Sequence, residues 1–153
     1  MVRMACENDI GETAELFCEL QNVHAEFRPD SFKSADSGIM HGILSDILIG
    51  RECDAVVSES DGSINGYAVF RIADREDELH IAERRCTIEQ FAVKSEFKRQ
   101  GIGRELMDFI RKYAEKRKCD SIELSVWYDN FDAVDFYAEI GFVPKQYMME
   151  IKL

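Results

Sequence analysis

The segment Phe97–Leu106, FKRQGIGREL, places two glycines one residue apart where a strand is expected to lead into a helix. An alternating apolar run at 86–93 precedes it, and helical apolar periodicity over 101–117 follows. The first amides of a helix lack partners within the helix, and with the helix dipole they favour an anion, typically a phosphate. Glycines let backbone and ligand approach closely, so we expect a phosphate-binding turn here.

Charge is distributed unevenly along the chain. The formal net charge is −11, which argues against a nucleic-acid partner because such a protein needs a basic face. Residues 94–118 nevertheless hold nine basic and four acidic side chains, a local net of +5, which leaves −16 for the remainder. Lys98, Arg99 and Arg104 of the glycine turn belong to this basic segment, which fits an anionic ligand.

Length and composition predict one domain over residues 1–153, with no repeat or linker. No stretch of about 18 apolar residues indicates a membrane span, and the first residues do not resemble a secretory signal. The five cysteines are scattered without a CxxC pair, so neither a disulfide framework nor a metal site is expected. We expect a soluble, cytoplasmic protein with no nucleic acid, membrane or metal as partner.

Periodicity and turn residues predict a mixed α/β fold with a mostly antiparallel sheet flanked by helices. The expected strands are 2–6, 53–59, 64–73, 86–93, 121–127 and a closing strand at 147–153. The expected helices are 12–27, 38–49, 101–117 and 130–140. Residues 60–63, SDGS, predict a hairpin turn. Residues 74–85 are too highly charged to assign.

Three kinds of phosphate-binding turn can be compared with the glycine segment. A P-loop needs GxxxxGK[ST], which is absent. A dinucleotide fingerprint needs a third glycine where Leu106 stands. The turn that remains is the pyrophosphate turn of acyl-CoA-dependent transferases.

Two motifs resemble the GNAT N-acetyltransferase superfamily. FAVKSEFKRQGIGRELM resembles motif A, V-x-x-x-x-[RQ]-x-x-G-x-[GA], with Lys98 as a departure at the Arg/Gln place. LSVWYDNFDAVDFYAEIGF, residues 124–142, resembles motif B, L-x-V-x-x-x-N-x-x-A-x-x-[FL]-Y-x-x-x-G-F. The resemblance is specific over residues 86–153 and looser over 1–85, and it implies the GNAT acyl-CoA N-acyltransferase fold. HAEFRPDSF, residues 24–32, is similar to a segment before the second helix in some members.

The resemblance implies transfer of an acetyl group from acetyl-CoA to a primary amine by direct attack. An alkylammonium has a pKa near ~10.4, so exposing the free amine at pH 7 costs about 4–5 kcal/mol and calls for a base. The thioester carbonyl needs an oxyanion donor, and the departing thiolate benefits from a proton donor. The candidate residues for binding acetyl-CoA are Phe91, Ala92, Val93, Lys98, Arg99, Gln100, Gly101, Ile102, Gly103, Arg104, Asn130, Ala133 and Phe136.

Two residues are candidates for proton transfer. Tyr137 matches the family tyrosine near the CoA sulfur, although it could equally be a buried aromatic of a helix face. Glu89 is the candidate base, because period-2 alternation predicts that it shares a strand face with Phe91 and Val93. Glu89 could instead be exposed or paired with an arginine, and Glu123 or an ordered water are alternative bases.

His24, Arg28 and Asp30 lie where the N-terminal helices would border the acceptor, so they are candidate substrate contacts or, alternatively, surface residues after a helix end. Asn130 could bind the cofactor or cap a helix. The acidic surface favours a cationic acceptor: a small-molecule amine, a lysine side chain or a protein N-terminus.

Two alternatives to an active enzyme remain. One is a GNAT-like domain that binds acyl-CoA as a sensor without turnover, and the other is a nucleotide-binding regulator of a different fold. The sequence leaves open the acceptor, the acyl chain length and the oligomeric state, a homodimer included.

Overall fold

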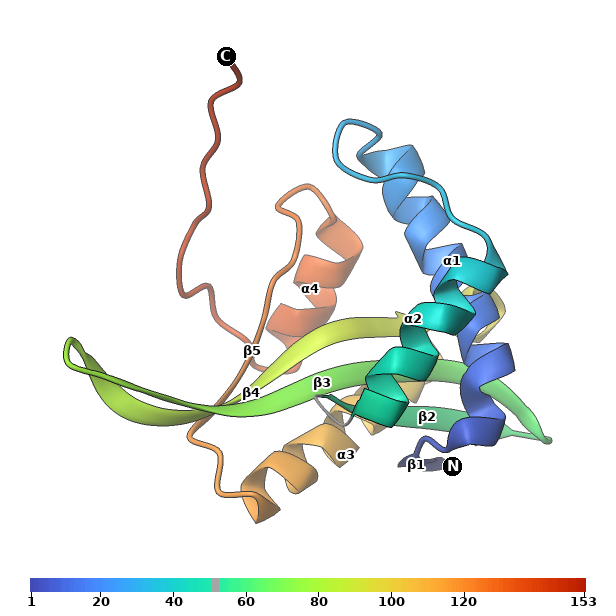
Figure 1. The fold of residues 1–153 in the computed structure, drawn as a ribbon, viewed down its shortest axis with the longest axis horizontal. Helices are drawn as coiled ribbons and strands as arrows, with labels where there is room; N and C mark the ends of the chain where they lie inside the picture. The colour runs from blue at the N-terminus through green and yellow to red at the C-terminus, as the bar shows by residue number, and fades with distance from the viewer. Residues whose placement is uncertain (51–52) are drawn as a thin grey trace.

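A single mixed sheet forms the centre of the protein in the computed structural model, which describes residues 1–50 and 53–153 (Figure 1). Its strands within these residues are β1 (Val2–Met4), β2 (Asp54–Ser60), β3 (Ser63–Asp77), β4 (His80–Val93) and β5 (Ser121–Leu124). They lie in the order β1-β2-β3-β4-β5. The first three pairs are antiparallel and β4 pairs with β5 in parallel, which confirms the predicted mixed, mostly antiparallel sheet.

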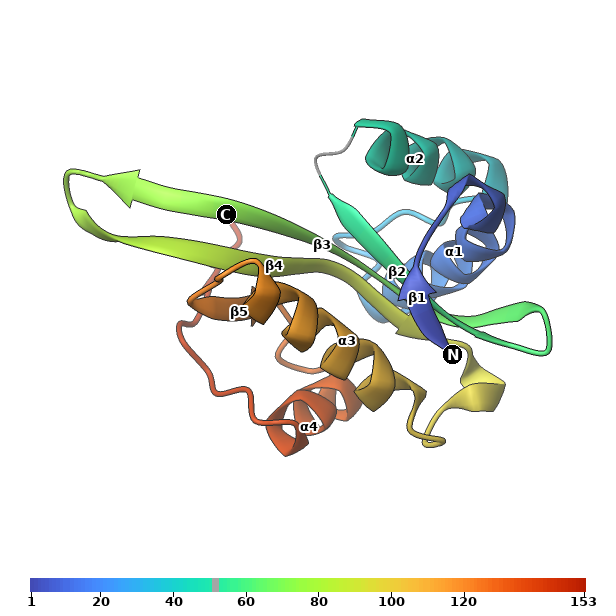
Figure 2. The same cartoon turned by 90° about the horizontal axis from the view of Figure 1, so that it is seen from below.

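Helices cover both faces of the sheet (Figure 2). One face carries α1 (Ile10–Phe27) and α2 (Ser37–Gly50), and the other carries α3 (Ile102–Lys116) and α4 (Phe131–Glu139). Strand alternation supplies a core to each side: Tyr67 and Val69 pack beneath α1 and α2, whereas Ala68 and Phe70 pack against α3. All four of these side chains are fully buried.

The β2–β3 connection confirms the predicted hairpin. Asp61 and Gly62 form a two-residue turn with φ of 52° and 78°. Two consecutive positive φ values match the type I′ turn, whose twist suits antiparallel strands and whose preferred residues include Asp-Gly. The residue types of this four-residue segment were therefore sufficient to predict the hairpin.

The charged segment 74–85, which had no assignment, forms the outer part of the β3–β4 hairpin. This arm extends beyond the helices on the left of Figure 1. An Arg84–Asp74 ion pair at 3.2 Å and a hydrogen bond of 2.7 Å between His80 and Asp77 link its two strands and its tip. Because no helix covers the arm, it needs no apolar alternation, and the usual sequence signal of a strand is absent.

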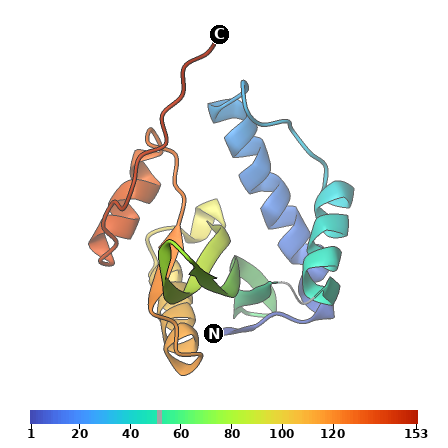
Figure 3. The same cartoon turned by 60° about the vertical axis from the view of Figure 1, so that its left-hand side comes forward.

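The predicted closing strand at 147–153 is wrong. Residues 143–153 form neither helix nor strand, and the chain runs away from α4 as an extended tail (Figures 1 and 3). The alternation of apolar residues suits a strand, but a strand also needs a partner strand, and this segment pairs with none among the described residues.

An ion pair between Arg3 and Asp9 links β1 to the turn before α1, and we expect it to stabilise the fold. Arg3 donates to both carboxylate oxygens of the buried Asp9, at 2.7 and 2.8 Å, and these bonds hold the pKa of Asp9 at about 2. Replacing Asp9 with asparagine should lower the free energy of unfolding by about 2 kcal/mol at pH 7. A carboxylate with a depressed pKa stabilises above its unfolded pKa, so the deficit should shrink as the pH falls from about 5 to 2.

Urea unfolding at several pH values measures this effect. Asp46→Asn, at an exposed position of α2, is the matched control and should change stability by less than about 0.5 kcal/mol. A deficit in Asp9→Asn that stays constant down to pH 2 would contradict the assigned role of the Arg3–Asp9 pair.

Candidate active site

The parallel strands β4 and β5 separate where the motifs meet. They pair only from Arg85–Ile88 to Ser121–Leu124, whereas β4 continues to Val93. The end of β4, including Phe91, Ala92 and Val93, pairs with β3 on one side and has no partner strand on the other within the described chain. We call this divergence of the two strands beyond Ile88 and Leu124 the wedge; along it, one edge of β4 is unpaired.

A β-bulge at Glu89 corrects the predicted orientation of that residue. Val69 pairs with Gln90 and Phe70 with Ile88, so Glu89 is the extra residue on β4. Arg71, which bonds Glu89 at 3.1 Å, lies between two residues that pack on the α3 side. By alternation the pair therefore lies on the α1/α2 face.

The prediction that Glu89 shares a face with Phe91 and Val93 is wrong, because both of those residues pack with Ile88 in the core on the α3 side. Simple alternation fails across a bulge, since one strand gains a residue that the other lacks. The result places the carboxylate and the Phe91 ring on opposite faces of β4. The Glu89–Arg71 contact also matches the alternative that Glu89 is paired with an arginine.

The glycine turn has the geometry of an anion site. Arg99 has φ of 61° and Gly101 has φ of 89°, and α3 begins immediately afterwards at Ile102. Glu105 N–H, which donates to Gly101 O at 3.0 Å, is the first amide of the helix to be bonded. Within the part of the chain that the structure describes, no protein acceptor takes the amides of residues 99–104.

Side chains around this turn leave its amides accessible. Lys98, Arg99 and Arg104 are exposed, so their charges surround the turn without filling it. Gln100 donates its side-chain N–H to Glu96 O at 2.9 Å and braces the preceding 3-10 turn (Ser95–Phe97). Lys98, the departure from the family motif, is thus one of the exposed cationic side chains at the turn.

Gly103 joins the turn to an aromatic patch. A Cβ at this position would lie 3.1 Å from Phe136 Cζ and 3.7 Å from Phe91 Cε1. Phe91, Phe136 and Tyr137 pack together, with ring centroids 5.3 to 6.1 Å apart. The structure thus brings together the turn, the end of β4 and α4, which lie up to 46 residues apart in the sequence.

Burial tunes the Tyr137 hydroxyl. Its ring lies among Phe91, Phe136 and Phe142, and burial raises the pKa of Tyr137 to about 12. Desolvation disfavours the phenolate, so the group keeps its proton at neutral pH. Tyr137 is therefore suited to donate a proton, and the aromatic packing described as its alternative role is also present.

The start of α4 is capped by Asn130. Asn130 Oδ1 accepts from the Ala133 N–H at 3.4 Å, which is the contact expected of an N-cap. This observation supports the structural alternative for Asn130. Ala133 is half-buried on the same helix as Tyr137, one turn earlier.

A second cluster gathers where α1 ends. The guanidinium carbon of Arg28 lies 4.4 Å from the centroid of the Trp127 ring, and Arg28 bonds Asp30 at 3.0 Å. The Phe32 ring lies between those of His24 and Trp127, with centroid distances of 5.0 and 5.6 Å, and meets the Trp127 ring edge to face. Burial lowers the pKa of His24, so the neutral imidazole is favoured.

All three predicted substrate contacts lie in this cluster, together with Phe32 and Trp127, which the sequence does not single out. The sequence held one signal for Trp127, its place within motif B at the end of the expected strand 121–127. No local signal connects Phe32 with a tryptophan 95 positions away. The cluster joins the α1–α2 connection to the segment after β5.

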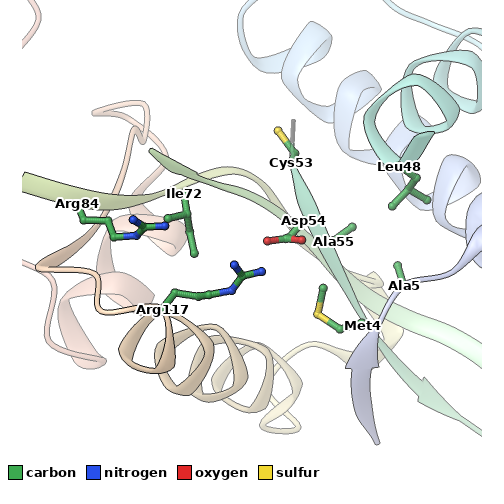
Figure 4. Close-up of a pocket in the computed structure, with 9 residues that line it drawn as sticks. All are labelled: Met4, Ala5, Leu48, Cys53, Asp54, Ala55, Ile72, Arg84 and Arg117. Carbon is green, nitrogen blue, oxygen red and sulfur yellow. The ribbon is translucent and has the colours of Figure 1, made fainter. Parts of the chain in front are cut away.

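A cavity of about 500 Å³ lies elsewhere (Figure 4). It is lined by side chains that include Met4, Asp54 and Arg117. Arg117 follows the last residue of α3 and Gly101 precedes the first, so a 15-residue helix of about 22 Å separates the cavity from the glycine turn. Tyr113 links Asp54 and Arg117 through bonds of 2.9 and 2.8 Å. The polar groups of Asp54, Tyr113 and Arg117 are therefore hydrogen-bonded to one another.

Among the described residues, no group of three or more His, Cys, Asp or Glu side chains is arranged to hold a metal ion. No helix of the described chain combines the length and apolar character needed to cross a membrane.

Comparison with known proteins identifies the family. The sequence profile of the acetyltransferase (GNAT) family matches residues 17–142, most of the chain. The chain belongs to the acetyltransferase (GNAT) family. An uncharacterized N-acetyltransferase in the pepI 3' region of Lactobacillus delbrueckii subsp. lactis is 27% identical to this GNAT protein over 81 residues. That match covers 53% of the chain and 46% of the relative, so the chain matches less than half of the relative's length.

Solved structures share the GNAT fold over the whole chain. A mutant of the BH1408 protein from Bacillus halodurans superimposes with a TM-score of 0.94 at 24% identity, covering 100% of this chain and 99% of that one. The AAC(6')-Iy protein in complex with the bisubstrate analog CoA-S-monomethyl-acetylneamine superimposes with a TM-score of 0.79 at 13% identity, covering 100% and 97%. At these identities the likeness establishes the fold.

Proposed function

We propose that this GNAT protein transfers an acetyl group from acetyl-CoA to a primary amine. One observation carries the proposal: the turn with unbonded amides at residues 99–104 lies against Phe136, whose ring packs on that of Tyr137. A diphosphate bound at the turn would bring the rest of a CoA molecule toward the wedge between β4 and β5. AAC(6')-Iy, which shares the fold, is solved with CoA.

The chain offers a group for each chemical need of the reaction. Backbone amides at the turn bind the diphosphate, and the end of β4 holds the pantetheine arm through Phe91 and Val93 backbone. Val93 N–H polarises the thioester carbonyl. Tyr137 donates its proton to the departing thiolate. Its raised pKa keeps the hydroxyl protonated at neutral pH, as a proton donor must be.

Glu89 takes the proton of the attacking ammonium, directly or through water. Because of the bulge, the Glu89 carboxylate lies on the α1/α2 face of the sheet. The cluster of aromatic and charged side chains at the end of α1 lies at the end of a helix on this same face. The cluster of His24, Arg28 and Asp30 with Trp127 then forms the outer wall of the acceptor site. The acidic remainder of the chain favours a cationic acceptor, among which small amines, lysine side chains and protein N-termini remain candidates.

A panel of amines tests the proposal by release of CoA thiol from acetyl-CoA. We expect thiol release that depends on both acetyl-CoA and a primary amine, and mass spectrometry should show the amine 42 Da heavier, the mass of acetyl replacing hydrogen. Acetyl-CoA binding without thiol release for any amine would instead favour the sensor hypothesis. Thermal stabilisation by ATP or NAD, but not by CoA, would contradict both.

Gly103 gives a direct test of the diphosphate site. Gly103→Val should raise the Kd for acetyl-CoA by about tenfold or more, because the added side chain occupies the space between the turn and the Phe136 ring. Isothermal titration calorimetry measures the effect. Gly42→Val is the matched control, since an added Cβ at Gly42 meets nothing within 4 Å. Equal Kd values in both variants and wild type would contradict a phosphate site at this turn.

A further inference from the structure

The cavity of about 500 Å³ lies at the opposite end of α3 from the glycine turn. Elements that are distant in the sequence border it: Met4 ends β1, Asp54 begins β2, and Arg117 follows α3. Its volume falls in the range of about 300–1,000 Å³ that is usual for small-molecule sites. The cavity is therefore large enough for a ligand, and its lining indicates which kind.

Two guanidinium groups line the cavity, Arg84 from β4 and Arg117 from the end of α3 (Figure 4). Arg117 donates from Nη2 to the Tyr113 hydroxyl at 2.8 Å, and its other N–H groups have no protein acceptor among the described residues. Arg84 donates from Nη1 to Asp74 at 3.2 Å, whereas its buried Nε has no acceptor in the described part of the chain. A buried donor without an acceptor is unusual in a folded protein. Both side chains therefore keep hydrogen-bond donors that a ligand can use.

These donors favour an anion, and the charges around them favour a carboxylate. The two oxygens of a carboxylate can accept from two guanidinium groups at once, in the planar geometry that arginine prefers. Asp54 lines the same cavity, where its Oδ2 accepts from the Tyr113 hydroxyl at 2.9 Å. Its negative charge opposes a more highly charged anion, such as phosphate, more strongly than a singly charged carboxylate.

Apolar side chains form much of the remaining lining. They include Met4, Ala5, Leu48, Ala55 and Ile72. In Figure 4, Met4 and Leu48 lie on the other side of Asp54 from the two guanidinium groups. Burying an apolar chain against these side chains is favourable, whereas an inorganic anion leaves them in contact with water. The lining therefore suits an anion that carries an apolar chain.

We infer that this cavity is a second binding site, which takes a small carboxylate with a short apolar chain. The carboxylate accepts hydrogen bonds from Arg84 and Arg117, and the apolar chain packs toward Met4 and Leu48. The length of α3 separates this site from the glycine turn, so the inference does not depend on the proposed acetyl transfer.

Titration of the full chain with hexanoate, followed by heteronuclear NMR, tests the inference. We expect the amide signals of Asp54 and Ile72 to shift with a Kd of about 1–10 mM, while those of Ile102 and Gly103 at the glycine turn stay unchanged. Hexanamide has the same chain without the charge and should bind about tenfold more weakly or less. Inorganic phosphate should also bind more weakly than hexanoate. Equal binding of hexanamide, or tighter binding of phosphate, overturns the carboxylate assignment.

Substitutions of the two arginines test the assigned donors. Arg84→Gln and Arg117→Gln should each raise the Kd for hexanoate about tenfold or more, because each removes a charged donor. Lys116→Gln is the matched control: it removes the same charge at the same end of α3 but does not line the cavity, so the Kd should stay within about twofold. A wild-type Kd in both arginine variants, or no shift at Asp54 and Ile72, overturns the inference. If circular dichroism shows that an arginine variant is unfolded, the comparison of hexanoate with hexanamide on the wild-type chain decides.

Discussion

Replacing Tyr137 with phenylalanine is expected to lower kcat for acetyl transfer by about 100-fold, within the range for losing a positioned general acid. The Kd for acetyl-CoA should change by less than about twofold, because the ring contacts to Phe91, Phe136 and Phe142 remain. The proposed interaction arises only as the thiolate departs, so its loss affects the transition state and not ground-state binding. Stopped-flow or steady-state thiol release gives kcat, and calorimetry gives Kd.

The pH dependence provides a second readout. Burial raises the pKa of Tyr137 to about 12, so the hydroxyl stays protonated through the neutral and moderately alkaline range. Loss of the phenolic proton should therefore not limit kcat of the wild-type enzyme below about pH 11.

Tyr128→Phe is the matched control for Tyr137→Phe. Tyr128 is 81% exposed in the connection between β5 and α4, and its loss should leave kcat within about twofold. Wild-type turnover in Tyr137→Phe would remove the assigned role and leave Tyr137 as a packing residue of α4.

Local sequence signals were sufficient wherever the determining interaction is itself local. Asp61–Gly62 set the hairpin, and Gly101 marked the left-handed residue from which α3 begins. Pro29 follows the end of α1 at Phe27, as its missing N–H and restricted predecessor predict. The glycine turn and the Tyr137 segment were also recognisable, because each lies within one continuous motif. Their proximity follows once the fold is known.

Sequence signals failed where distant segments or an extra residue decide the outcome. The bulge at Glu89 depends on the register between β3 and β4, which no pattern within β4 reveals. The cluster at the end of α1 joins Arg28 to Trp127, 99 positions apart. The tail has the alternation of a strand, yet pairing depends on an available edge, and strand propensity alone cannot supply one.

Glu89→Gln is expected to lower kcat/KM by about 100-fold at pH 7 if Glu89 accepts the ammonium proton. The deficit should shrink as the pH rises, because the fraction of free amine grows about tenfold per pH unit up to the amine pKa near ~10.4 and the base becomes dispensable. A pH–rate profile with a primary amine acceptor measures this convergence. A deficit that is uniform from pH 7 to 10 would point to a role other than proton transfer.

Two further variants separate catalysis from simple ion pairing. Arg71→Gln breaks the same contact with Glu89, an exposed pair worth at most about 1 kcal/mol of stability. If Glu89 served only to hold Arg71, the two variants would lose equal activity with the same pH dependence; a base predicts a larger, pH-dependent loss for Glu89→Gln alone.

Glu123→Gln tests the competing carboxylate, whose oxygens already bond Arg85 and Lys145 at 3.3 and 3.2 Å. Because those bonds occupy both oxygens, we expect kcat/KM within about threefold of wild type, and a loss that converges at high pH would move the base from Glu89 to Glu123.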